Sequence, residues 1–209
     1  MKILNIVLPK IYPITDTRIS GLSHLEQVKR SVAGGATLIQ LREKHLSPAE
    51  FCEDASAAIA YARERSVKII INDRVDIAAA YNANGVHLGQ DDLPLSEARK
   101  ILGDGAIIGF STHTLEQVRE ALRLPVDYIA YGPIFDTRTK QDPDATVGLS
   151  PLMKVREIIG NRPLVAIGGI DGDNYRSVLA AGADSVAIIS AILSDPDQIE
   201  AKMRSFNNT

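Results

Sequence analysis

The chain has 209 residues, a length that one globular domain commonly reaches, with 45% hydrophobic and 23% charged residues. This composition excludes disordered, collagen-like and disulfide-framework proteins, and Cys52, the only cysteine, can form neither an intrachain disulfide nor a cysteine metal cluster. The 23 Lys and Arg against 26 Asp and Glu give a formal net charge of -3, so no overall positive field exists to hold nucleic acid or an anionic membrane. Any anion must therefore be bound locally.

The beginning of the chain predicts no export. Residues 1–9 carry one charge and a short apolar stretch broken by Asn5, which makes a poor secretory signal. No uninterrupted apolar run reaches the roughly 18 residues needed to cross a bilayer. We expect a cytoplasmic protein without a membrane partner.

Apolar runs rich in Val, Ile and Leu alternate eight times with amphipathic stretches at helical spacing. The predicted strands are 11–15, 38–42, 68–71, 85–88, 107–110, 128–131, 164–167 and 185–189. The predicted helices are 23–33, 48–65, 74–81, 94–102, 115–122, 150–159, 173–180 and 196–203. Ser47, Ser150 and Asp195 each precede a proline, which is typical of a capping residue before the first helical position.

Strands that alternate with helices pair in parallel, and nearly continuous apolar strands are buried on both faces. Eight such units predict an α/β fold, a single (β/α)8 TIM barrel domain over residues 1–209. The alternative is an open doubly wound sheet, but no G-x-G-x-x-G follows the first strand. The only long connection, residues 135–148, is polar and follows the sixth strand, so it is a candidate active-site lid.

Polar residues follow the predicted strands, where such barrels place their chemistry. Gln40, Arg42 and Lys44 are spaced by two and share one face of an extended segment. The alternative is a solvated strand end with Arg42 or Lys44 paired to Glu43.

The third and fourth strands both end in carboxylates. Asn72 and Asp73 follow one, and Asp92 follows the other. Either Asp alone could be a helix cap, but two carboxylates beside two cations suit Mg²⁺ and a phosphorylated ligand. His87 has no second histidine at matching spacing, which favours a hydrogen-bonded strand residue over a metal ligand.

The last strands indicate a second anion site. Gly168 and Gly169 follow the seventh strand and Ser190 follows the eighth, where backbone N–H groups often bind phosphate. The alternative explanation of the two glycines is a tight turn that needs positive φ, and such a turn is compatible with phosphate binding. After the fifth strand, Ser111 is followed by His113 and by Thr114, which we expect to cap the next helix.

Taken together, these motifs resemble the thiamine phosphate synthase family. The resemblance rests on Tyr12-Pro-Ile-Thr-Asp16, Ile39-Gln-Leu-Arg-Glu-Lys44, Ile71-Asn-Asp-Arg74, Gly85-Val-His-Leu-Gly-Gln-Asp-Asp92, Gly109-Phe-Ser-Thr-His113, Tyr131-Gly-Pro-Ile-Phe135, Thr137-Arg-Thr-Lys140 and Ala166-Ile-Gly-Gly-Ile170. It implies a transferase that joins 4-amino-2-methyl-5-hydroxymethylpyrimidine diphosphate to 4-methyl-5-(2-hydroxyethyl)thiazole phosphate, with Mg²⁺ as cofactor.

The resemblance also implies roles for individual residues. Diphosphate would be held by Arg42, Lys44, Asn72 and Lys140, and Mg²⁺ by Asp73 and Asp92. The aminopyrimidine would contact Gln40 and Ser111, and the thiazole phosphate would lie among Thr137, Thr139, Gly169, Ile189 and Ser190. Lys140, Ser111, Arg42 and Lys44 are the catalytic candidates.

The family reaction is dissociative: diphosphate leaves, and the thiazole nitrogen captures the pyrimidine methylene cation. The protein then needs charge neutralisation, alignment and exclusion of water rather than a nucleophile. Two alternatives share the barrel. One is a thiazole tautomerase-like relative using His113, and the other is a phosphate-ligand-binding barrel without turnover.

Overall fold

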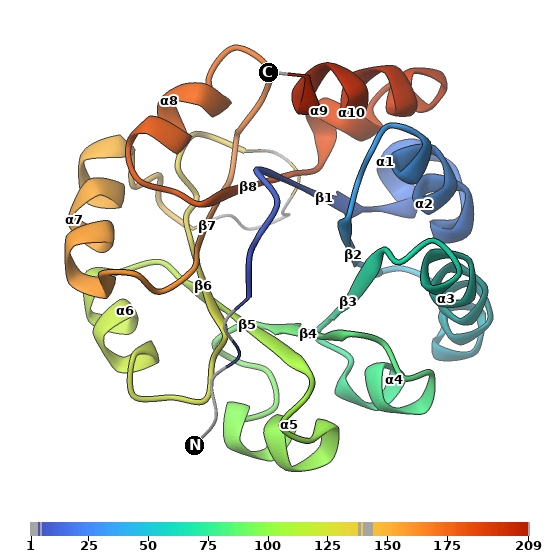
Figure 1. Cartoon of the computed structure of the whole chain (residues 1–209), viewed down its shortest axis with the longest axis horizontal. Helices are drawn as coiled ribbons and strands as arrows, with labels where there is room; N and C mark the ends of the chain where they lie inside the picture. Colours follow the sequence, from blue (N-terminus) through green and yellow to red (C-terminus); the bar gives the residue numbers. More distant parts are fainter. Residues whose placement is uncertain (1–3, 5, 138, 140–143, 209) are drawn as a thin grey trace.

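The computed structural model describes residues 4, 6–137, 139 and 144–208. Eight parallel strands close into one barrel in chain order, so the predicted (β/α)8 barrel is confirmed (Figure 1). The strands are β1 (Ile11–Thr15), β2 (Leu38–Leu41), β3 (Lys68–Asn72), β4 (Gly85–Leu88), β5 (Ile107–Thr112), β6 (Tyr128–Tyr131), β7 (Leu164–Ile167) and β8 (Ser185–Ile188).

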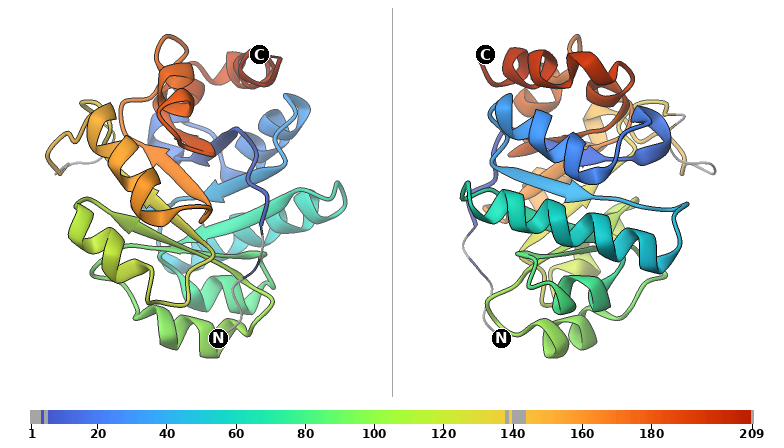
Figure 2. Two further views of the ribbon diagram at one scale, coloured as in Figure 1. Left: turned by 60° about the vertical axis from the view of Figure 1, so that its left-hand side comes forward. Right: turned by 90° about the vertical axis from the view of Figure 1, so that its right-hand side faces the viewer.

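The helices lie outside the barrel, as the views in Figure 2 show. They are α1 (Thr17–Ser20), α2 (His24–Ala33), α3 (Pro48–Arg63), α4 (Val75–Ala80), α5 (Leu95–Leu102), α6 (Leu115–Ala121), α7 (Leu149–Ile159), α8 (Tyr175–Ala180), α9 (Ser190–Leu193), the 3₁₀ helix η1 (Pro196–Gln198) and α10 (Ile199–Asn207). The C-terminal α10 packs beside the end of α2, where Asn207 Nδ2 donates to the Gly34 carbonyl at 3.0 Å. No helix in the described part of the chain is both long and apolar enough to span a bilayer.

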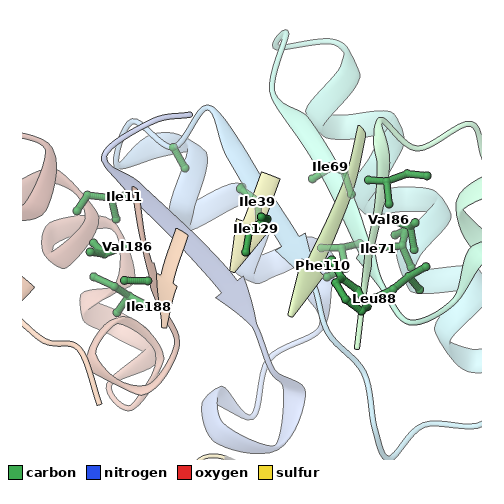
Figure 3. Packing of buried hydrophobic residues seen from close by; sticks show 14 of the residues in the cluster. Ile11, Ile39, Ile69, Ile71, Val86, Leu88, Phe110, Ile129, Val186 and Ile188 are labelled. Carbon is green, nitrogen blue, oxygen red and sulfur yellow. The ribbon is translucent and has the colours of Figure 1, made fainter. Parts of the chain in front are cut away.

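Buried apolar side chains occupy both faces of the strands, which explains why the strands read as continuous apolar runs. On β3, Ile69 and Ile71 pack toward the helices, whereas Ile70 lies in the inner cluster that fills the barrel. Figure 3 shows Ile71 beside Leu88 and Phe110 of the next two strands in this outer layer.

The predicted helix starts are confirmed at some positions and wrong at others. Ser47 forms a capping box with Glu50, and Thr114 accepts from the N–H of Gln117. Ser150 is not a cap, because α7 begins one residue earlier after Gly148, whose N–H donates to the Ile134 carbonyl. Asp195 precedes a 3₁₀ turn without a side-chain cap bond.

A buried ion pair closes the end of the barrel where the strands begin. Asp127, fully buried, accepts from the N–H of Leu4 at 2.7 Å and of Ile108 at 2.7 Å, and from Arg99 Nη2 at 2.8 Å. The more exposed pair Asp184 and Arg156 repeats this arrangement two units later, with Asp184 also accepting a strand N–H.

Candidate active site

A chain of polar groups crosses the barrel interior toward the ends of the strands. Gln40 Nε2 donates to Tyr12 Oη at 3.1 Å, and Tyr12 Oη lies 3.2 Å from Tyr128 Oη. His87 continues the chain, with Nδ1 2.9 Å from Tyr128 Oη and Nε2 2.8 Å from Ser111 Oγ. The prediction that His87 is a hydrogen-bonded strand histidine is therefore confirmed.

Space for the Tyr128 ring comes from the neighbouring strand. Tyr128 pairs in register with Gly109 of β5, and a Cβ at Gly109 would overlap the phenol ring. The glycine thus allows a full tyrosine side chain to lie inside the barrel beneath His87, where the two rings stack with planes 19° apart.

The two cations after β2 have carboxylate partners directly after the neighbouring strands β1 and β3. Arg42 Nη1 donates to Asp16 Oδ2 at 2.5 Å, and Lys44 Nζ forms an ion pair with Asp73 Oδ2. Because β2 ends at Leu41, strand alternation does not orient these two side chains; their contacts with Asp16 and Asp73 do. The alternative pairing of either cation with Glu43 is wrong.

Glu43 instead folds the loop that carries both cations. Its Oε1 accepts from the backbone N–H groups of residues 44, 45 and 46, and its Oε2 accepts from Thr17 Oγ1 at 2.7 Å. Oε2 also lies 3.1 Å from Nε2 of the buried His24. Burial raises the pKa of Glu43, but these hydrogen bonds outweigh it and lower the pKa to about 2. Glu43 is therefore an ionised anchor beneath Arg42 and Lys44.

The predicted metal ligands lie side by side. Asp73 follows β3 with φ +60°, a backbone conformation that Asp adopts more readily than most residues. Burial raises the pKa of Asp92, and the adjacent Asp73 carboxylate raises it further. The N–H of Gly89, which donates to Asp92 Oδ2 at 2.7 Å, lowers it. Neither residue caps a helix: α4 follows Arg74, α5 follows Pro94, and neither helix has a side-chain cap bond.

Burial lowers the pKa of His87 to about 4, against the opposing charge of Asp92. An unfolded histidine titrates near pH 6.5, so between these values the unfolded chain binds one more proton than the folded chain. We expect the free energy of unfolding to fall by roughly 3 kcal/mol from this residue as the pH drops from 7 to 4. The free energy of unfolding of the His87→Gln variant, measured by denaturant titration at each pH, should lack this part of the pH dependence. An identical pH dependence in both proteins contradicts the assignment.

The loops after β6 and β7 are packed against each other. The N–H of Phe135 donates to the Gly168 carbonyl at 3.0 Å, and Cβ atoms at Gly168 or Gly169 would strike residues 133–136. Both glycines have positive φ, so the tight-turn explanation holds, and the side of each where a Cβ would lie faces this loop. The stem of the long loop is closed by Thr146 Oγ1, which donates to Asp136 Oδ1 at 2.6 Å.

The remaining candidates lie around these loops. Asn72 ends β3, Thr137 Oγ1 accepts from the N–H of Thr139 at 3.3 Å, and Ser190 begins α9 directly after Ile189. Because the first turn of a helix leaves backbone N–H groups without intrahelical acceptors, such donors lie at the start of α9. Lys140 and its neighbour at position 138 lie outside the described residues.

Several residues that organise this end of the barrel were missed from the sequence. They are Asp16, His24, Tyr12, Tyr128 and Glu43 as a loop anchor. A tyrosine within a strand next to a strand glycine was the available signal for Tyr128, whereas the partners of Asp16 and His24 are distant in sequence and left no local pattern.

The fold and the strand ends together define a (β/α)8 barrel whose mouth gathers two cations and a carboxylate pair, the arrangement of an enzyme for small anionic substrates. The family model described as thiamine monophosphate synthase matches residues 11–192. A thiamine-phosphate synthase of Clostridium novyi is 46% identical over 189 residues, 90% of this chain and 92% of the relative. One of Chloroflexus aurantiacus is 42% identical, over 94% and 91% of the two chains.

A solved structure agrees with these relatives. Thiamine phosphate pyrophosphorylase from Pyrococcus furiosus superposes with a TM-score of 0.85 at 36% identity, covering 95% of this chain and 94% of that one. The chain belongs to the thiamine-phosphate synthase family, and it is a transferase of thiamine biosynthesis.

Proposed function

We propose that the chain joins the aminopyrimidine diphosphate to the thiazole phosphate at the mouth of the barrel and releases diphosphate. The observation that carries the proposal is the convergence of Arg42 and Lys44 with the paired carboxylates of Asp73 and Asp92 at the ends of β2, β3 and β4. Arginine and lysine side chains bind the phosphate oxygens of a diphosphate. Two adjacent carboxylates disfavour each other's charge, so a cation bound between them stabilises both.

The donor set fits Mg²⁺. This ion takes one or two protein carboxylates and completes its shell with phosphate oxygens and water, and Asp73 and Asp92 supply two adjacent carboxylates. The Lys44 ammonium already lies against Asp73, so the site attracts cations. When bound, Mg²⁺ would supply positive charge to the leaving diphosphate.

The other residues bind and orient the substrates. We assign the diphosphate to Arg42, Lys44, Asn72 and Lys140, with Asp16 and Glu43 holding the two cations of the β2 loop in place. Gln40 and Ser111 lie at the two ends of the polar chain and would contact the pyrimidine. The cation left after diphosphate departs is stabilised by the electron-rich ring and protected by a closed site.

The thiazole phosphate is assigned to the neighbouring loops after β6, β7 and β8. Thr137, Thr139, Gly169, Ile189 and Ser190 all lie on these loops or at the start of α9. Loops after the seventh and eighth strands of such barrels frequently bind phosphate.

Replacing Ser190 by alanine tests this placement. Loss of one hydroxyl contact to phosphate is expected to raise the KM for the thiazole phosphate about tenfold and to leave the KM for the pyrimidine diphosphate unchanged. Ser194→Ala, four residues along at the exposed end of α9, is the matched control. An effect confined to the diphosphate substrate contradicts the placement.

The direct test of the function is product formation. Purified protein with Mg²⁺ and both substrates is expected to release one diphosphate for each thiamine phosphate formed, and chelation of the metal is expected to stop both. Thiazole tautomerisation without diphosphate release would favour the alternative based on His113, whose Nδ1 lies 2.7 Å from the Gly132 carbonyl.

A further inference from the structure

The polar chain inside the barrel has a direction. It contains four hydrogen bonds joining Gln40, Tyr12, Tyr128, His87 and Ser111, and all but Ser111 are almost fully buried. The Gln40 amide nitrogen can only donate, so Tyr12 Oη accepts at that end. Its own hydrogen is then available to Tyr128, 3.2 Å away.

A phenol oxygen can accept twice, so the direction of the next link follows from the Tyr12 hydrogen: among the described residues, Tyr128 Oη is the only acceptor within its reach. Tyr128 accepts from Tyr12 and has one hydrogen left, which can go to Nδ1 of His87. A buried imidazole between two neutral hydroxyls is neutral and carries a single N–H. With Nδ1 accepting, that N–H is on Nε2 and donates to Ser111 Oγ. Within the described part of the chain Ser111 Oγ has no other partner, so its hydrogen can be donated to a ligand.

We propose that Tyr128 is a positioning residue: by donating to His87 it holds the Nε2–H tautomer and thereby makes Ser111 a hydrogen-bond donor toward the substrate. A pyrimidine ring nitrogen only accepts, so Ser111 can bind it only in this arrangement. In the opposite arrangement His87 would carry its hydrogen on Nδ1 and Ser111 would donate to His87. The substrate would then meet an acceptor, which suits its amino group and not a ring nitrogen. The contact between Ser111 and the pyrimidine rests on the proposed function, whereas the tautomer does not.

Nitrogen NMR of the ligand-free protein with labelled histidine reads the tautomer directly. We expect His87 in the Nε2–H form, and the Nδ1–H form overturns the proposal. In Tyr128→Phe the donor to Nδ1 is lost, so the Nδ1–H form should become populated. Tyr131→Phe is the matched control for this spectrum, because Tyr131 packs in the outer layer and takes no part in these hydrogen bonds, so the Nε2–H form should persist.

Kinetics supply the second readout. Tyr128→Phe is expected to raise the KM for the pyrimidine diphosphate about tenfold, the effect of one lost hydrogen bond, with the KM for the thiazole phosphate unchanged. Tyr131→Phe, on the same strand but packed in the outer layer, should change neither value. An unchanged tautomer and unchanged KM in Tyr128→Phe overturn the positioning role. If Tyr128→Phe does not fold, the wild-type spectrum alone decides the direction.

A failure of the proposed function has a different signature. A wild-type protein that shows the Nε2–H tautomer but forms no thiamine phosphate contradicts that function and still supports the hydrogen-bond direction.

Discussion

Replacing Asp92 by asparagine is expected to lower turnover by about 10² to 10³-fold, because several kcal/mol of charge stabilisation at the leaving diphosphate depend on a bound metal ion. The Asp92→Asn change should not lower the stability of the fold. Asparagine keeps an oxygen that can accept from Gly89, and it removes a negative charge that burial and Asp73 disfavour. Turnover and Tm measured on the same protein check both parts.

Asp91→Asn is the matched control, since Asp91 is the neighbouring carboxylate and is exposed. It should change neither activity nor Tm. If Asp92→Asn instead keeps its activity, the role of Asp92 is only to accept from Gly89 in this turn, and the metal assignment is wrong.

The largest loss of stability is expected from Asp127→Ala. This change leaves the Arg99 guanidinium buried without its counter-charge and two backbone N–H groups without an acceptor. Breaking a buried pair in this way costs about 3–5 kcal/mol, a large fraction of the stability of a typical domain. Denaturant unfolding measures the loss.

The repeated pair provides the control. Asp184 has the same two kinds of partner, a strand N–H and an arginine, but its side chain is 48% exposed. Asp184→Ala should therefore cost only roughly 1 kcal/mol. Equal losses in the two variants would show that burial does not set the cost.

Most of the fold could be predicted because the strands are buried on both faces. Their apolar runs have abrupt ends, and four of the eight strands have the predicted bounds. Helix starts were less predictable where tertiary contacts decide them. Pro151 favours a start after Ser150, but the hydrogen bond between Gly148 and Ile134 in the loop stem sets the start of α7 earlier. The four-residue α9 is too short to show helical periodicity.

The candidate site could be predicted only in part. Residue types and their places after strands indicated Asp73, Asp92 and the two cations. The structure brings Lys44, Asp73 and Asp92 together, whereas Arg42 pairs with Asp16. Their orientation could not be predicted, because strand alternation ends at Leu41 and the contacts that take over join residues 26 and 29 positions apart. Glu43 lies between two cations in the sequence, so an ion pair was the obvious expectation. Its actual contacts are three backbone N–H groups and the side chains of Thr17 and His24, which no sequence pattern displays.

The most direct test of the proposed site is a crystal structure with Mn²⁺ and diphosphate, in which anomalous scattering locates the metal. The proposal predicts a metal ion about 2.1 Å from carboxylate oxygens of both Asp73 and Asp92, with Arg42 and Lys44 on the diphosphate. A metal bound away from both carboxylates, with Lys44 still paired to Asp73, would contradict it.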